Sequence, residues 1–365
     1  MFLGEDSLFL YKQSGHVFGF EKEAAALLLQ IDEKLSQGIK KERLPDLFPD
    51  VPVNDIDTLV DILLSRNVSA DDEDYEQPLD TGFFTKDTKT RITYSVSPLP
   101  LNFSVHYPDR SLYTLIHPIF SHFSTSYFPE RTINVDFEDT SEGLWQILFN
   151  GKKVAYPVKA ETLPLVLQEN MIIASYQSTP YLIALHAGTV GKKGRCVVMP
   201  AQSGSGKSTL TAALADAGFS LYSDEITRLD YDGKIVPLPF CMNIKEGSWS
   251  VLENRYASLR HSAEYLRFDG QKVKMIPPKN PAKEEGEAAI LLFPKYIEGN
   301  TTVIKKLSQC EALHRIKEAG YQLEKPLTSE TFHAVLKKVI NRPAYLMEYG
   351  SLDEAVAKVD ALLDG

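Results

Sequence analysis

A glycine- and serine-rich segment near the middle of the chain carries the residue types that bind phosphate in proteins. It follows an apolar run at 196–199 and precedes a small-residue helix pattern at 210–217, so the expected order is strand, loop and helix. The residues expected to line the phosphates are Gln202, Ser203, Gly204, Ser205, Gly206, Lys207, Ser208 and Thr209. The segment therefore predicts a binding site for a nucleoside triphosphate.

The chemistry of this loop depends on its glycines and on the residues that follow them. Glycine lets successive backbone N–H groups point inward, and the positive end of the following helix adds attraction for phosphate. Lys207 is expected to reach the β- and γ-phosphates of ATP, and the Ser208 hydroxyl is expected to bind Mg²⁺. Ala201 stands where the consensus has its first glycine. The alternative is a surface turn that happens to precede Lys-Ser.

A histidine lies on the strand pattern that leads into this loop. Strand patterns on both sides of residues 191–194 predict an antiparallel hairpin. If its two turn residues are Lys192 and Lys193, His186 pairs with Met199. His186 would then lie beside the mouth of the loop, as a hydrogen-bond partner of phosphate or of an acceptor hydroxyl. The alternative is a histidine with a purely structural role.

Two adjacent carboxylates end the next strand pattern, at 219–223, which follows the helix that Gly218 is expected to end. In an open α/β sheet, ligands lie outside the carboxyl ends of the strands. Neighbouring side chains on an extended chain point to opposite sides, so these two acids cannot share one task. We expect Asp224 to act as general base toward an acceptor hydroxyl and Glu225 to lie on the metal side. The alternative is a solvated turn.

These segments resemble the catalytic blocks of the HPr kinase/phosphorylase superfamily. The matching residues are Leu185-His186-Ala187, the loop 201–209 and Ser223-Asp224-Glu225, with further agreement at 237–240, 293–296 and 345–349. The resemblance spans roughly residues 90–365. It implies an α/β kinase core with the phosphoenolpyruvate-carboxykinase-like phosphate-loop fold, a histidine near the γ-phosphate and a first Asp that serves as base. The superfamily assembles into oligomers, so a homo-oligomer is implied as well.

Two departures from the superfamily pattern limit what the resemblance implies. Glu225 replaces the second Asp, and its side chain is one methylene longer. The glycine-rich signature that follows the acidic pair in authentic HPr kinases is missing from the sequence. HPr as substrate and the reverse phosphorolysis reaction are therefore not implied. Lys245 could add positive charge near the phosphates, although an exposed lysine without that role is the alternative.

The first 70 residues form a separate pattern of short strands and helices. The expected strands are 8–11 and 16–18, and the expected helices are 24–35 and 56–64. Gly38 is expected to cap the end of the first helix, and Asn54 the start of the second. The pattern resembles a winged-helix module of the PqqD type, which implies binding of a leader or precursor peptide. The alternative is that the module only packs on the catalytic core.

The net negative charge of this module favours peptide binding over DNA binding. Residues 1–70 carry 12 Asp and Glu against 7 Lys and Arg, the wrong sign for contact with a phosphate backbone. An acidic stretch without periodicity follows, and we expect a linker at 71–89 before the catalytic domain at 90–365. Alternating strand patterns begin at 91, and a helical pattern covers 162–178.

The whole composition restricts the partners further. The chain has 365 residues and a formal charge of −10 with no basic tract, so neither nucleic acid nor an anionic membrane surface is an expected partner. Its cysteines, Cys196, Cys241 and Cys310, lie far apart in apolar surroundings, as expected for buried thiols in a reducing cytosol. No signal peptide or membrane-spanning pattern is expected, which predicts a cytoplasmic protein.

The sequence therefore predicts an ATP-dependent, Mg²⁺-dependent kinase that transfers the γ-phosphate to a hydroxyl. The expected acceptor is a serine or threonine of a peptide or carrier protein, in a natural-product or surface-polysaccharide pathway. Two alternatives stay open. One is a kinase for a small molecule such as serine, a sugar or a nucleoside. The other is a nucleotide-dependent switch or scaffold that transfers nothing.

Overall fold

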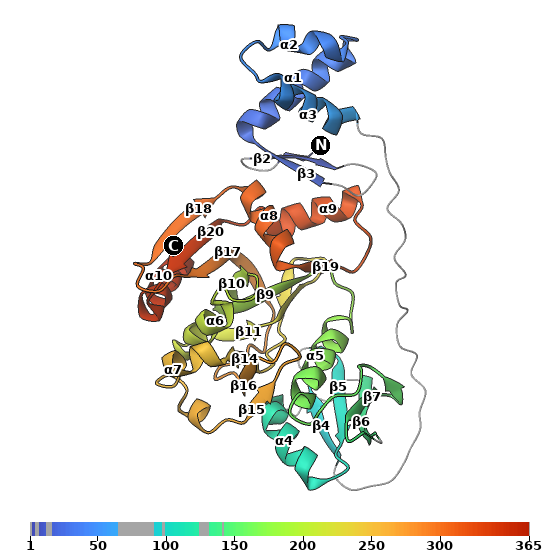
Figure 1. Cartoon of the computed structure of the whole chain (residues 1–365), viewed down its shortest axis with the longest axis vertical. Helices are drawn as coiled ribbons and strands as arrows, with labels where there is room; N and C mark the ends of the chain where they lie inside the picture. The colour runs from blue at the N-terminus through green and yellow to red at the C-terminus, as the bar shows by residue number, and fades with distance from the viewer. Residues whose placement is uncertain are drawn as a thin grey trace. The chain divides into compact units, whose positions relative to one another are not determined.

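The computed structural model describes residues 2–3, 7–11, 17–64, 91–96, 99–123, 131–140 and 142–364. The predicted linker at 71–89 lies outside these ranges. The chain divides into two compact units, which we describe separately (Figure 1). The first comprises Met1–Glu76, Leu307–His314 and Lys325–Asn341, and the second comprises Gln77–Lys306, Arg315–Glu324 and Arg342–Gly365.

The first unit combines a small antiparallel sheet with short helices. The strands are β1 (Phe2–Leu3), β2 (Ser7–Tyr11) and β3 (Val17–Glu21), and the N-terminal helices are α1 (Lys22–Ser36), α2 (Leu44–Leu47) and α3 (Val53–Leu64). The buried residues of its apolar core are Phe20, Ala25, Leu28, Ile31, Leu44, Ile56, Leu59 and Val60. The predicted hairpin and both predicted helices are present. Their likeness to a peptide-recognition module stays a prediction.

The two predicted caps of these helices have different outcomes. Gly38 adopts φ +84° and its N–H donates to the Leu35 carbonyl at 3.0 Å, so the left-handed end of α1 is confirmed. The Asn54 cap is wrong, because α3 already begins at Val53. The carbonyl of Pro52 accepts the first helical hydrogen bonds, and Asn54 lies within the first turn.

The second unit begins with a five-stranded sheet covered by two helices. The strands are β4 (Arg91–Ser95), β5 (Leu101–His106), β6 (Arg131–Asp139), β7 (Trp145–Phe149) and β8 (Lys152–Lys153), and the helices are α4 (Arg110–Phe120) and α5 (Leu163–Tyr176). Phe103 of β5, Ile116 of α4 and Leu167 of α5 are buried in one apolar core. Asn150 and Gly151 form the turn between β7 and β8, with positive φ angles of 49° and 78°.

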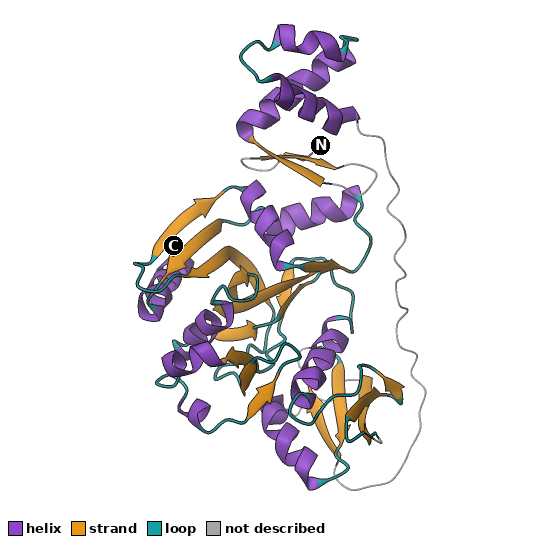
Figure 2. Cartoon of the chain, viewed as in Figure 1, coloured by secondary structure: helices purple, strands orange, loops and turns teal. Residues whose placement is uncertain are grey.

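A nine-stranded mixed sheet forms the centre of the second unit, and helices lie beside its strands (Figure 2). Its strands are β9 (Ile183–Lys192), β10 (Arg195–Pro200), β11 (Ser220–Ser223), β12 (Ile226–Leu229), β13 (Lys234–Val236), β17 (Gly286–Tyr296), β18 (Val303–Leu307), β19 (Tyr321–Leu323) and β20 (Ala344–Tyr349). Strand β10 pairs with β9 and, in parallel, with β17. The strands β9, β12, β13, β17 and β10 therefore pair in a closed ring.

Helices pack on this sheet through small and apolar side chains. They include α6 (Lys207–Asp216) and α10 (Leu352–Asp364), whose Leu214 and Val359 are fully buried in a shared core. A smaller sheet of β14 (Met242–Lys245), β16 (Lys272–Ile276) and β15 (Glu264–Leu266) follows. The second unit also contains α7 (Trp249–Leu252), whereas α8 (Gln309–Ala319) has residues in both units and α9 (Ser329–Val335) belongs to the first. No helix among the described residues is long and apolar enough to cross a membrane.

The hairpin that leads into the phosphate loop is present, but its predicted register is wrong by two residues. Met199 pairs with Gly188 rather than with His186. The turn is formed by Lys193 and Gly194, which adopt φ angles of 51° and 76°. Two positive φ angles define the turn that matches the twist of a hairpin, and glycine at the second position favours it. His186 therefore lies beyond the end of the β9–β10 pairing and pairs with Ile226 of β12.

Candidate functional site

The segment between β10 and α6 has the geometry of a phosphate-binding loop. Gly204 and Gly206 both adopt φ +90°, a left-handed conformation that residues with a Cβ rarely take. The N-cap residue of α6, Gly206, has no capping side chain, and the Ser205 hydroxyl accepts a long hydrogen bond of 3.4 Å from the Lys207 N–H. Backbone N–H groups at the start of a helix attract anions, so this end of α6 suits a phosphate group.

Two tyrosines hold the loop in this conformation; both lie in segments that agree with the superfamily pattern, 293–296 and 345–349, but the sequence assigned them no role. The Tyr349 hydroxyl donates to the Gly206 carbonyl at 3.1 Å, and the Tyr296 N–H donates to the Ser205 carbonyl at 3.0 Å. A Cβ on Gly206 would lie 2.4 Å from the Tyr349 hydroxyl oxygen. Close packing and the positive φ angle therefore both require glycine at this position. Nothing local in the sequence links residue 349 to residue 206.

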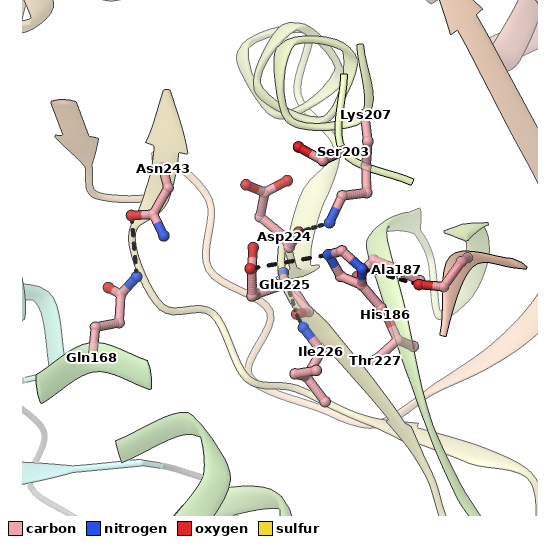
Figure 3. Close-up of polar contacts among 12 residues, drawn as sticks. Gln168, His186, Ala187, Ser203, Lys207, Asp224, Glu225, Ile226, Thr227 and Asn243 are labelled. Atoms are coloured by element: carbon pink, nitrogen blue, oxygen red, sulfur yellow. Dashed lines mark hydrogen bonds and ion pairs between the residues drawn. The ribbon is translucent and has the colours of Figure 1, made fainter. Parts of the chain in front are cut away.

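Lys207 is buried at the base of the loop, with 6% of its surface exposed. Its ammonium donates to the backbone carbonyl of Asp224 at 2.8 Å. This contact joins the first residue of α6 to the end of β11 (Figure 3). A buried lysine held by one carbonyl keeps two further N–H groups for an anion above it.

The Asp224 carboxylate lies beneath the loop in a dry environment. The residue is 4% exposed, and neither of its carboxylate oxygens has a hydrogen-bond partner among the described residues. Burial raises the pKa of Asp224 to about 7 against the opposing effect of the Lys207 ammonium, and Glu225 adds to the rise. The hydroxyls of Ser208 and Thr211 lie near enough to lower it slightly.

The unpartnered carboxylate oxygens of Asp224 indicate whether the site suits Mg²⁺. Buried polar atoms without partners are rare, and a carboxylate next to a serine hydroxyl can supply oxygen ligands to a hard cation. The described residues contain no group of three or more His, Cys, Asp and Glu side chains placed to hold a metal by themselves. Mg²⁺ bound with a nucleotide needs only one or two protein oxygens besides phosphates and water. Asp224 and Ser208 fit that requirement.

Glu225 and His186 face each other on the opposite side of the Asp224 backbone. The Glu225 Oε1 lies 4.0 Å from the His186 Nε2, and both side chains are partly exposed (Figure 3). The Asp224 carboxylate is turned away from His186 in the same view. The expectation that the adjacent acids point in different directions is therefore met.

The hydrogen bonding of His186 defines which ring nitrogen can accept a proton. Burial and then the Lys207 ammonium lower the pKa of His186, so the ring is neutral at neutral pH. Its Nδ1 lies 3.1 Å from the Ala319 carbonyl, which can only accept a hydrogen bond. The proton of the neutral ring is therefore assigned to Nδ1. Nε2 then presents a lone pair toward Glu225, so two proton acceptors face one gap.

A pocket of about 710 Å³ lies over the loop, a size that suits a small-molecule ligand. All eight residues from Gln202 to Thr209 line it, together with His186, Glu225 and Lys245. Lys245 donates to the Ser203 hydroxyl at 2.7 Å, so this predicted phosphate contact lies at the loop. Asp224 lies outside the set of described residues that line the pocket.

The structure thus brings every predicted site residue to one place and adds others that the sequence analysis missed. Thr209 exchanges a 2.6 Å hydrogen bond with the hydroxyl of Ser248, and Arg267 lines the pocket from the small sheet. Ser248 and Arg267 lie outside the segments that agree with the superfamily pattern, so no signal in the sequence indicated them.

Comparisons with known proteins give little further information. No protein-family model matches the chain, and no curated protein matches it. Among solved structures, one match is the structure of the HPr(Ser) kinase/phosphatase from Coxiella burnetii, with 10% sequence identity and a TM-score of 0.23. The match covers 50% of this chain and 99% of that one. A similarity this low carries no argument, so the function is argued from the geometry of the site.

Proposed function

We propose that the protein is an ATP-dependent kinase that transfers the γ-phosphate to a hydroxyl group. The observation that carries the proposal is the pairing of a phosphate loop with two carboxylates in different environments. Asp224 is dry and faces Ser208, whereas Glu225 is half exposed and faces the pocket with His186. Enzymes give two carboxylates different tasks by placing them in different environments. Here the two tasks would be metal binding and proton transfer.

On the metal side, Asp224 and Ser208 are the residues that would hold Mg²⁺. When bound, Mg²⁺ neutralises charge on the β- and γ-phosphates. Asp224 was expected from the sequence to act as base, but its oxygens are buried beside Ser208 and Thr211 of α6 and do not line the pocket. A base must come within hydrogen-bonding reach of the acceptor hydroxyl. The opposite division of tasks therefore fits the geometry better, with Asp224 on the metal side.

On the acceptor side, Glu225 and the His186 Nε2 are placed to take the proton of the hydroxyl. The two acceptor atoms lie 4.0 Å apart, so a hydroxyl to one side of the pair, within hydrogen-bonding distance of both, can donate to either. The hydroxyl oxygen attacks the γ-phosphorus and the bond to the β-phosphate oxygen breaks, which releases ADP. Lys207, Lys245 and the loop N–H groups oppose the charge on the moving phosphoryl group.

The proposed acceptor is a serine or threonine of a peptide or carrier protein, and the proposed role of residues 1–70 is to bind that partner. Tethered binding raises the concentration of a substrate at a site without new contacts there. A chain lacking residues 1–70 should therefore show a lower kcat/KM for the peptide. Unchanged kinetics would remove the docking role.

The test is transfer of label from γ-labelled ATP with Mg²⁺, read by mass spectrometry on candidate peptides and on a panel of serine, sugars and nucleosides. Lys207→Ala should abolish transfer, whereas Lys153→Ala, which changes an exposed lysine of β8, should leave it unchanged. Label on a metabolite alone would favour the small-molecule kinase. ATP binding without transfer to any acceptor would favour the switch and refute the proposal.

A further inference from the structure

A second pocket of about 500 Å³ lies next to the nucleotide pocket. Its walls come from one face of α5, from the residues that follow β15 and from the start of β12. The residues that line both pockets are His186, Glu225, Asn243 and Arg267. The two proton acceptors of the proposed reaction therefore stand at the border between a phosphate-binding space and a second space.

The wall that α5 contributes is fixed in place. Gln168 is 1% exposed and exchanges two hydrogen bonds with the backbone of Cys241, at 3.0 and 3.1 Å. Its amide also lies 3.4 Å from the Asn243 side chain, which belongs to β14 (Figure 3). Buried hydrogen bonds of this kind hold two elements at a defined distance. The second pocket is thus a preformed space.

The lining of this pocket is largely apolar and partly open. It includes Leu165, Ile172 and Ile226, together with Ile173, which is 37% exposed, and Phe268, which is 77% exposed. A large aromatic side chain in contact with water beside an apolar pocket gains free energy when a ligand covers it. Because Ile173 and Phe268 are exposed, the rim of the pocket beside them is open to solvent.

The charges around the pocket are mainly negative. Arg267 is engaged by Asp269 at 3.4 Å, which leaves Glu169 and Glu225 facing the space. Partial burial raises the pKa of Glu169, and the negative charge of Glu225 raises it further, although the side chain still reaches solvent. A neighbouring acidic group on a ligand would meet repulsion here, whereas a cationic or uncharged one would not.

We infer that the second pocket binds the acceptor, and that the acceptor is a peptide whose serine or threonine has a bulky apolar neighbour and no acidic neighbour. This inference rests on the proposed kinase function. The apolar neighbour occupies the space between α5 and Phe268, and the hydroxyl reaches the gap between His186 and Glu225. The hydroxyl proton passes to one of these acceptors while the oxygen bonds to the γ-phosphorus and ADP leaves.

The experiment uses the full chain, Mg²⁺, ATP and short synthetic peptides with one central serine in an alanine and glycine background. Leu, Lys, Asp or Ala is placed beside the serine. Leu should raise kcat/KM over Ala by about tenfold or more, as expected from burial of one such side chain. Asp should lower it. Equal rates for all four peptides would overturn the inference.

Two variants locate the effect. Phe268→Ala should remove most of the preference for Leu, whereas Tyr156→Ala, which changes another highly exposed aromatic, should keep it. Glu169→Lys should reverse the order of the Asp and Lys peptides. A reversal of preference cannot result from misfolding, and its absence would count against the assigned pocket.

The outcomes also separate this inference from the proposed function. Transfer that depends on Lys207 but not on the neighbours of the serine refutes the acceptor pocket and leaves the kinase intact. Transfer to free metabolites alone refutes the peptide as occupant. If no acceptor of any kind is labelled, both proposals fall together.

Discussion

The half of the site that we propose binds nucleotide (the nucleotide half) and the half that we propose binds the acceptor (the acceptor half) are built in different ways. Lys207 and Asp224 on the nucleotide side are almost fully buried, and two tyrosines fix the loop above them. His186 and Glu225 on the acceptor side keep 33% and 43% of their side chains exposed. The first half is preformed for a phosphate group of constant shape. The second is a fixed wall with an open rim, which suits partners that vary.

The contrast is sharpest between Asp224 and Glu225, which are adjacent in the chain. Successive side chains on an extended backbone point to opposite sides, so the Asp224 carboxylate lies in the protein interior and the Glu225 carboxylate lines a pocket. The buried carboxylate has no hydrogen-bond partner for either oxygen among the described residues, whereas the Glu225 side chain is 43% exposed and reaches solvent. The two positions should therefore respond differently to the same chemical change, the replacement of a carboxylate by an amide.

The largest expected effect comes from Glu225→Gln and Asp224→Asn compared in one assay. Loss of a general base typically costs about 10²- to 10⁴-fold in rate. We expect Glu225→Gln to lower kcat by that order with ATP affinity nearly unchanged. Asp224→Asn should instead weaken ATP binding in the presence of Mg²⁺ and leave the affinity without Mg²⁺ similar. Equilibrium binding with and without Mg²⁺, followed by single-turnover transfer, measures both.

The opposite pair of results would contradict the assignment of Asp224 to the metal and of Glu225 to the acceptor. Normal Mg²⁺-dependent affinity with a collapsed kcat in Asp224→Asn would restore Asp224 as the base that the sequence indicated. Glu225→Asp is a useful companion, because it keeps the charge and withdraws the carboxylate by one methylene. A partial recovery relative to Glu225→Gln is expected if the carboxylate must reach the hydroxyl.

A smaller effect is expected on the stability of the ligand-free protein. The pKa of Asp224 is raised to about 7 in the folded chain, from an ordinary value of 3.8. The unfolded chain therefore releases this proton at lower pH, and the free energy of unfolding should fall as pH rises from about 4 to about 7. Asp224→Asn lacks this ionisation.

The variant should therefore gain stability relative to the parent protein by on the order of 2 kcal/mol between pH 5 and pH 8. Denaturant unfolding of both proteins at the two pH values measures the difference. A constant difference across that range would mean that Asp224 is not desolvated in the folded protein.

Sequence alone located the nucleotide half because its signals are local. A glycine-rich loop between a strand and a helix depends on a few consecutive residues, and Lys207 and Ser208 lie next to the glycines that shape it. The strand that ends at Asp224 was predicted for the same reason. Their spatial closeness followed from the general position of ligands at the carboxyl ends of strands.

His186 and Glu225 were named from the sequence, but the second pocket on the acceptor side could not be predicted because it depends on contacts between distant segments. The α5 wall was recognised only as a helix, and nothing in its pattern indicated that residue 168 would bond to residue 241. The register of the β9–β10 hairpin was missed because one lysine adopts a positive φ angle, which shifts the turn by one position. Burial also decides which of two adjacent acids is dry, and the chain order does not reveal that.

The smallest effect is expected within the loop itself, from a pair of matched glycine variants. Gly204 and Gly206 share φ +90°, so Ala at either position carries the same backbone strain of about 1–2 kcal/mol. Only at Gly206 would the new Cβ also meet the Tyr349 hydroxyl, whereas no atom of the described part of the chain lies within 4 Å of one at Gly204. Gly206→Ala should therefore weaken ATP binding more than Gly204→Ala, by several-fold in calorimetric titration. Equal losses of ATP affinity would mean that the contact of Tyr349 with Gly206 does not stabilise the loop. The nucleotide half would then be no more rigid than the acceptor half.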